Sequence, residues 1–221
     1  MKLHIYLFRH GQTYYNKDHI FTGWKDSKLT PKGIKQAKIV AKKLKNKKFQ
    51  VAVKTTLSRS KDTLKYVLKY HPECKKIMTD NSMIERSYGK LEGRHHSELV
   101  KESGTRDYKT LLHWHKIDHL GGKERQEFIK KHGEADLHII RRSYKTVPPK
   151  GESVEMVEKR VKEFIKDMLI YMKMHKVNIA ISAHGNSMRP FRRYFEHLSI
   201  NQMMKLENPF DDYFEYTINV K

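Results

Sequence analysis

The sequence predicts an α/β fold, a three-layer α/β/α sandwich in which helices cover both faces of a mostly parallel sheet. Short apolar runs alternate along the chain with longer segments whose apolar residues recur at helical spacing, which is typical of this fold class. The chain has 221 residues and a single cysteine, so it is long enough to bury a core without disulfide bonds. We therefore expect one domain over residues 1–221.

The strands are predicted from short apolar runs that end at glycine or at polar residues. Four of these runs show little alternation, which indicates strands buried on both faces. The last one alternates between apolar and polar residues, so we expect it to be an antiparallel edge strand. The predicted strands are 3–8, 51–53, 77–78, 177–182 and 213–220.

The helices are predicted where a capping residue precedes apolar residues spaced three or four apart. Thr30 and Pro31 form such a start, because Thr is a favoured N-cap and Pro is favoured at the first helical position. A long helix begins at Glu152-Ser153, and its apolar residues fall on one core-facing stripe. That stripe is Val154, Val157, Val161, Phe164, Met168 and Met172. Further helices are predicted after Ser58 and after His184.

Residues 93–149 are polar and charged, show no strand pattern and are interrupted by glycines. We expect helices here that lie over the sheet, including a helical insertion at about 94–122. His115 and His119 stand four residues apart on one of these helices, a spacing that metal ligands use. No third ligand accompanies them, so we interpret them as surface histidines.

The net charge of +21 raises the question of a nucleic-acid partner. The lysines of the chain are spread from end to end rather than clustered, which favours a solvated basic surface that attracts small anions. The N-terminal apolar run is too short for a signal peptide or a membrane span. We expect a cytoplasmic protein with no membrane and no nucleic-acid partner.

Two predicted strands end in the same way, one at Arg9-His10-Gly11 and the other at His184-Gly185. Parallel strands bring their carboxyl ends to one crevice, and a third strand leads to Arg59 at a helix start. Two imidazoles and two guanidiniums would bind a phosphate or sulfate dianion. A histidine there can attack phosphorus, and Glu85 could protonate the leaving oxygen.

These residues lie in motifs that resemble those of the histidine phosphatase superfamily, and more closely its cofactor-dependent phosphoglycerate mutase branch. The motifs occur in family order over most of the chain. The superfamily motifs are Arg9-His10-Gly11, Phe21-Thr22-Gly23-Trp24, Glu85-Arg86-Ser87-Tyr88-Gly89 and His184-Gly185-Asn186-Ser187. Those similar to the mutase branch are Lys131-His132-Gly133-Glu134-Ala135, Arg141-Arg142-Ser143-Tyr144, Pro148-Pro149 and Glu152-Ser153.

The resemblance implies a phosphoglycerate mutase-like fold and an interconversion of 2- and 3-phosphoglycerate through a phosphohistidine. It implies that His10 is the nucleophile, that Arg9, Arg59 and His184 hold the phosphoryl group, and that Glu85 exchanges the proton. It implies no metal, priming by 2,3-bisphosphoglycerate, a small phosphorylated acid as substrate, and a homo-oligomer such as a dimer. The implied substrate-binding residues are Thr13, Asn16, Thr22, Gly23, Arg86, Tyr88, Arg141, Arg142, Gly185 and Asn186.

The sequence also departs from the mutase pattern. Gln12-Thr13 replaces the usual Glu-Ser, a pattern common among the phosphatases, and Ser87 replaces a histidine. The family's substrate lysine has no clear counterpart, so Lys123 and Arg125 are the candidates for it. The C-terminal tail that covers the site in mutases is much shorter in this sequence. A histidine phosphatase acting on phosphomonoesters or bisphosphoglycerate is therefore the alternative, and a non-catalytic polyanion-binding protein is a third.

Overall fold

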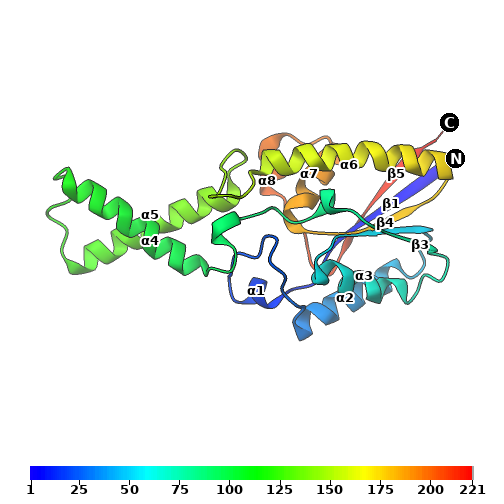
Figure 1. Cartoon of the computed structure of the whole chain (residues 1–221), viewed down its shortest axis with the longest axis horizontal. Helices are drawn as coiled ribbons and strands as arrows, with labels where there is room; N and C mark the ends of the chain where they lie inside the picture. The colour runs from blue at the N-terminus through cyan, green and yellow to red at the C-terminus, as the bar shows by residue number, and fades with distance from the viewer. Residues whose placement is uncertain (221) are drawn as a thin grey trace.

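The computed structural model describes residues 1–220, and a five-stranded sheet lies at its centre (Figure 1). Its strand order is β3-β2-β4-β1-β5, with β5 antiparallel to β1 and every other neighbouring pair parallel. The predicted fold class and the antiparallel edge strand are thus confirmed. The strands are β1 (Lys2–Arg9), β2 (Val51–Lys54), β3 (Lys76–Thr79), β4 (Ile179–Ala183) and β5 (Tyr213–Asn219).

Strand β1 is largely apolar and is fully buried from Ile5 to Phe8, because both faces of the sheet are covered there. Leu3, Ile5 and Leu7 belong to one apolar core, whereas Tyr6 and Phe8 belong to a second core on the opposite face. Successive side chains of a strand point to opposite faces, so an alternating pattern would have left one face polar. The two cores are what make the fold a three-layer sandwich.

Each core is closed by a pair of helices (Figure 1). Helices α2 (Pro31–Leu44) and α3 (Ser58–Leu68) cover the face that carries Tyr6 and Phe8, while α6 (Val154–His175) and α7 (Gly185–Glu196) cover the other. No helix within residues 1–220 is long and apolar enough to span a bilayer. The shorter elements are α1 (Tyr14–Lys17), η1 (Asn81–Met83), η2 (Gly89–Leu91) and α8 (Ile200–Lys205).

The predicted helix starts are confirmed in their capping geometry. The Thr30 hydroxyl accepts a hydrogen bond from the Gly33 amide at 3.0 Å, and Pro31 occupies the first helical position of α2. Ser153 caps α6 in the same way, through the Met156 amide at 3.1 Å. The six apolar residues of the predicted α6 stripe are all buried in the core.

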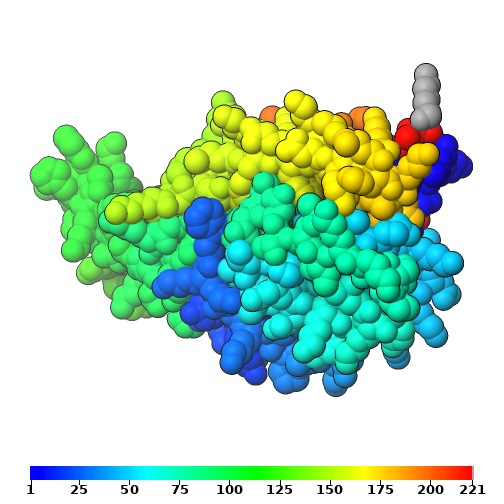
Figure 2. All heavy atoms as spheres, turned by 45° about the vertical axis from the view of Figure 1, so that its right-hand side comes forward, coloured from blue at the N-terminus to red at the C-terminus, as the bar shows by residue number. Residues whose placement is uncertain are grey.

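Helices α4 (His96–His113) and α5 (Gly122–Arg142) form an antiparallel pair that extends away from the sheet as an arm (Figures 1 and 2). The expectation that they lie over the sheet is therefore wrong. Gly104 and Gly133 allow the two helices to pack closely against each other. A Cβ atom at either glycine would lie 1.9 Å from a carbonyl oxygen of the facing helix, so only glycine allows this close approach.

The arm begins and ends next to the body, and its turn lies at the far end. His115 lies in that turn, exposed and paired with Asp118 at 2.8 Å. It adopts a φ of 53° just beyond the end of α4. His115 and His119 therefore do not share one helical face, which corrects the helix predicted through both.

Arg86 fixes the base of the arm to the body. Its side chain is fully buried and donates to the carbonyl oxygens of Glu152 at 2.6 Å, Ile140 at 2.8 Å and Thr146 at 2.8 Å. These carbonyls belong to the end of α5 and to the loop that leads into α6. Arg86 does not line the cleft described below, and each of its three nitrogens donates to a backbone carbonyl, so the structure gives it a supporting place rather than a place at the predicted substrate contact.

Replacing Arg86 by Met should destabilise the protein strongly while keeping most of the apolar volume. Three partly buried carbonyl groups would lose the donor of a charged side chain, and each such loss costs up to about 1–3 kcal/mol. We therefore expect the free energy of unfolding in urea to fall by more than ~3 kcal/mol. Arg94→Met, which removes only exposed ion pairs, is the matched control. An unchanged free energy of unfolding together with a raised KM would instead make Arg86 a substrate-binding residue.

Candidate active site

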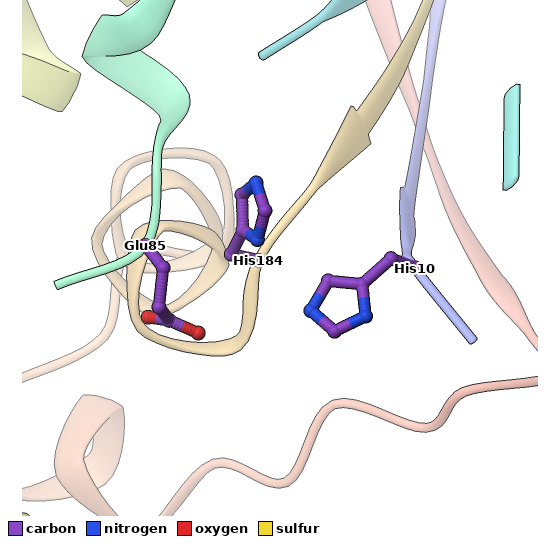
Figure 3. A group of neighbouring side chains, drawn as sticks. All are labelled: His10, Glu85 and His184. Carbon is purple, nitrogen blue, oxygen red and sulfur yellow. The ribbon is translucent and has the colours of Figure 1, made fainter. Parts of the chain in front are cut away.

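The site forms where three neighbouring parallel strands end. His10 follows β1 and His184 follows β4, and the pairing of Arg9 with Ala183 places the two histidines side by side. Their ring centroids are 5.0 Å apart, and the His10 amide donates to the Ala183 carbonyl at 3.2 Å. Arg59 enters from the first turn of α3, after the adjacent strand β2. Figure 3 shows His10, His184 and Glu85 entering the same space from three segments.

These side chains stand in the wall of a cleft of about 320 Å³. The cleft brings together most of the residues predicted from the sequence. His184 is fully buried beside His10 and is not itself part of the cleft lining. The predicted residues that line the cleft are Arg9, His10, Asn16, Thr22, Gly23, Arg59, Glu85, Tyr88, Arg141, Arg142, Gly185 and Asn186.

His10 is held in the tautomer that a nucleophile requires. Its Nδ1 lies 2.7 Å from the Gly11 carbonyl oxygen, which can only accept, so Nδ1 carries the proton and Nε2 carries the lone pair. Burial, followed by the charges of Arg59 and Arg9, holds the pKa of His10 well below its usual range. The imidazole is therefore neutral at pH 7, with Nε2 free to attack.

His184 is also buried and held by one polar contact. Its Nε2 lies 2.8 Å from the Thr55 hydroxyl at the end of β2. Burial lowers its pKa well below the usual value, and the charge of Arg59 lowers it further. The Nδ1 atom is buried without a hydrogen-bond partner within residues 1–220. In the tautomer whose Nε2 accepts from the Thr55 hydroxyl, Nδ1 carries the proton and can donate to an anion beside His10.

Arg9 and Arg59 place two guanidiniums against the two histidines. Arg59, 1% exposed, uses Nη2 and Nη1 to hold the carbonyls of Gly23 at 2.7 Å and Lys25 at 3.0 Å. Burial lowers the pKa of Arg59 and lowers that of Arg9 to about 10, which records the cost of desolvating both cations. Both Nε atoms are buried without an acceptor within the described residues. Such donors match the oxygens of a phosphate.

Glu85 is positioned by main-chain groups on both sides. Its Oε1 accepts from the amides of Arg86 at 2.8 Å and Asn186 at 3.1 Å. Its own carbonyl accepts from the Trp24 indole at 2.8 Å and from Arg160 at 3.1 Å. The carboxyl group is thereby fixed beside the two histidines, within reach of an oxygen on a bound phosphoryl group.

His10, Glu85 and His184 each offer one ligand atom, and these atoms lie within 4.8 Å of one another. This spacing alone would suit a metal ion. The neighbouring charges favour a different ligand, because two buried guanidiniums repel a cation and attract a dianion. The donor set therefore fits a phosphoryl group better than a metal.

Three further arginines line the cleft, and they come from helices α5 and α7. Arg141 and Arg142 line it from the last turn of α5, and Arg189 lines it from α7. Arg189 is mostly buried and donates to the Asn186 amide oxygen at 3.0 Å. Arg142 donates to the Glu207 carboxylate at 2.9 Å. The cleft can therefore hold a small molecule that carries an anionic group at each end.

Three other predicted residues lie outside the cleft lining. Thr13 is fully buried and caps α1, where its hydroxyl accepts from the Asn16 amide at 3.2 Å. Lys123 and Arg125 lie in the first turn of α5, at the end of the arm far from the cleft. Antiparallel pairing with α4 puts them there, and Arg125 stacks over Tyr108 at 4.8 Å. These three predictions of substrate contact are not supported.

Several lining or supporting residues were missed from the sequence. Thr55 could have been found as a polar residue at a strand end, and Arg189 as the residue one helical turn after Asn186. His96 packs edge-on against Phe21, with the ring centroids 4.4 Å apart, and no sequence pattern indicates that it lines the cleft. Burial, followed by the charge of Arg141, lowers its pKa to about 4, so it adds a neutral hydrogen-bonding group to the wall. Glu207 lies in a loop without any motif.

Comparison with known proteins agrees with this geometry. The family model for the histidine phosphatase superfamily (branch 1) matches residues 5–123 and 112–217. A 2,3-bisphosphoglycerate-dependent phosphoglycerate mutase from Methanococcus vannielii is 32% identical over 207 residues, covering 93% of this chain and 86% of the relative.

Two solved structures show the same fold at low sequence identity. A mycobacterial glucosyl-3-phosphoglycerate phosphatase superposes with a TM-score of 0.71 at 18% identity, covering 98% of this chain and 91% of that one. A phosphoglycerate mutase from Bacillus anthracis gives 0.65 at 21% identity, covering 98% and 92%. The family model and the 32% identical relative together show that the chain belongs to branch 1 of the histidine phosphatase superfamily, which confirms the superfamily predicted from its motifs.

Proposed function

We propose that this protein is a phosphoglycerate mutase, which interconverts 2- and 3-phosphoglycerate through a phosphohistidine at His10. The observation that carries the proposal is the presence of two groups of arginines in one small cleft, Arg9 and Arg59 beside His10 and Arg141 with Arg142 from the last turn of α5. A phosphoglycerate has an anionic group at each end, a phosphate and a carboxylate. The names of the 30–32% identical curated relatives support the same reaction. The proposal implies a cytoplasmic enzyme of glycolysis.

The proposed chemistry uses the neutral His10 as nucleophile. Its Nε2 lone pair attacks phosphorus and forms an N–P bond, while the P–O bond to the substrate breaks. Glu85 gives a proton to the leaving oxygen, and it takes one back from the hydroxyl that attacks the phosphohistidine. Arg9 and Arg59 stabilise the charge on the phosphoryl oxygens during both steps. In a turnover that starts from loaded His10, the phosphoryl group passes to the free hydroxyl of a phosphoglycerate, and His10 then takes the phosphoryl group from the neighbouring carbon. The phosphate has then changed carbon and His10 is loaded again.

The residues present fit 2,3-bisphosphoglycerate as a priming compound. The unpartnered donors of Arg9 and Arg59 suit one phosphate, and Arg141 and Arg142 suit a second anionic group. When bound, 2,3-bisphosphoglycerate supplies the phosphoryl group that loads His10.

A histidine phosphatase is the second candidate, and one observation favours it. The Glu207 carboxylate already neutralises part of the distal charge through its 2.9 Å contact with Arg142. A substrate with a phosphate and no second anion would leave that ion pair intact. Water would then accept the phosphoryl group from His10.

A coupled enolase assay, run with and without 2,3-bisphosphoglycerate, distinguishes the two candidates. We expect mutase turnover that depends on 2,3-bisphosphoglycerate and falls at least ~1,000-fold in His10→Ala, because the nucleophile is lost. Fast release of inorganic phosphate without formation of the isomeric phosphoglycerate would contradict the mutase proposal and support the phosphatase.

Replacing Arg141 and Arg142 by Ala should damage a mutase selectively. We expect kcat/KM for 3-phosphoglycerate to fall roughly 100-fold, because charge-assisted hydrogen bonds to the carboxylate are lost. Hydrolysis of p-nitrophenyl phosphate, which has no second anion, should change less than about threefold. The control is Lys130→Ala with Lys131→Ala, the same loss of charge at exposed positions of the same helix. Equal losses for both substrates would refute the assignment of the distal end.

The lowered pKa of His10 makes a prediction for stability against pH. Below pH ~6.5 the unfolded chain binds a proton at His10 that the folded chain does not, so the folded state loses stability as the pH falls. His10→Asn lacks this effect. The stability of the wild type relative to His10→Asn, measured by urea unfolding, should therefore fall as the pH drops below ~6.5, with a slope that approaches but does not exceed about 1.4 kcal/mol per pH unit. A constant difference would mean that His10 titrates normally in the folded protein.

A further inference from the structure

The segment that joins α8 to β5 forms one wall of the cleft, through Glu207, Asn208 and Phe210. Asn208 fixes this segment there. Its side-chain amide donates to the Gly185 carbonyl at 2.9 Å, and its main-chain carbonyl accepts from the Arg9 guanidinium at 3.1 Å. The Phe210 ring lies 3.9 Å from the Arg9 guanidinium carbon. The backbone beside Glu207 is thus anchored to the catalytic residues themselves.

The Glu207 side chain, unlike that of Asn208, lies mostly in solvent. It is 77% exposed, and its carboxylate accepts from Arg142 at 2.9 Å. Its charge also raises the pKa of Arg9 and of Arg189, so it acts on all three guanidiniums around it. Glu207 and Glu85 are the acidic residues of the cleft lining, and Glu85 is held by main-chain amides instead.

This arrangement puts a carboxylate of the protein on an arginine that the proposed function gives to the carboxylate of the substrate. We propose that Glu207 is a specificity-determining residue, which competes with the second anionic group of the substrate for Arg142. The inference rests on the proposed function. A ligand with a distal anion must displace Glu207, whereas a simple phosphomonoester leaves the ion pair in place.

The displacement is inexpensive for two physical reasons. An exposed ion pair contributes little, because water screens it and two long side chains lose freedom in forming it. The side chain can rotate into solvent while Asn208 keeps the backbone fixed. Glu207 should therefore lower the preference for a second anion by roughly two- to fivefold rather than abolish it.

The test compares two ligands that differ only at the distal group. 3-Phosphoglycerate has a carboxylate where glycerol 3-phosphate has a hydroxymethyl group. Dissociation constants are measured by calorimetry in a His10→Ala background, which prevents phosphoryl transfer. The quantity of interest is the ratio of the two constants, so an equal effect of His10→Ala on phosphate binding cancels.

We expect Glu207→Gln to raise the preference for 3-phosphoglycerate roughly two- to fivefold. Glu163→Gln makes the same change of charge on the exposed side of α6, away from the cleft, and should leave the ratio unchanged. Adding Arg142→Gln should remove the effect of Glu207→Gln, because the two residues act through one contact.

The outcomes separate the two hypotheses. If the parent prefers 3-phosphoglycerate but Glu207→Gln leaves the ratio unchanged or lowers it, Glu207 does not compete and the inference is overturned while the proposed function stands. If no variant prefers 3-phosphoglycerate over glycerol 3-phosphate, the cleft has no site for a second anion and the proposed function itself fails.

Discussion

Two buried guanidiniums next to two neutral histidines are the constraint on which the rest of the site depends. Arg9 and Arg59 are desolvated, and the nearby carboxylate of Glu85 offsets only part of their charge. Burying such cations is costly unless an anion compensates them. Burial, together with these charges, holds the pKa of both imidazoles low and keeps them neutral, which leaves His10 as a base and nucleophile rather than a cation. The site is therefore suited to a dianion. The same two guanidiniums that would bind the dianion also help to keep the nucleophile His10 neutral.

The sheet makes this arrangement possible at little conformational cost. Adjacent parallel strands deliver His10 and His184 to one edge in register, and the Gly11 carbonyl selects the tautomer of His10. Arg59 also fixes the loop around Gly23, whose φ of 51° and close contact with Glu92 exclude a larger residue. The reacting groups therefore stand on rigid elements, whereas the distal end is built from the base of the arm and from a loop.

Elements and site residues whose place depends on neighbouring residues could be predicted from the sequence. Residues whose place depends on long-range packing could not. Strand ends, caps and the α6 stripe depend on neighbouring residues, so the fold and the groups around His10 could be predicted. Arg86 stands in a functional motif, yet its acceptors lie 54 to 66 residues away, and nothing local indicates them. The position of Lys123 and Arg125 far from the cleft could not be predicted, because the glycine contacts that pair α4 with α5 in an arm join residues of different helices. Glu207 reaches the cleft only through the tertiary contacts of Asn208.

The central claim is that His10 carries the phosphoryl group. The most direct test is to incubate the protein with 2,3-bisphosphoglycerate, quench it at alkaline pH and locate the modification by mass spectrometry. The account predicts an acid-labile, alkali-stable phosphoryl group on His10 that disappears when 3-phosphoglycerate is added, and that is absent from His10→Ala. A phosphoryl group on another residue, or its persistence in His10→Ala, would contradict it.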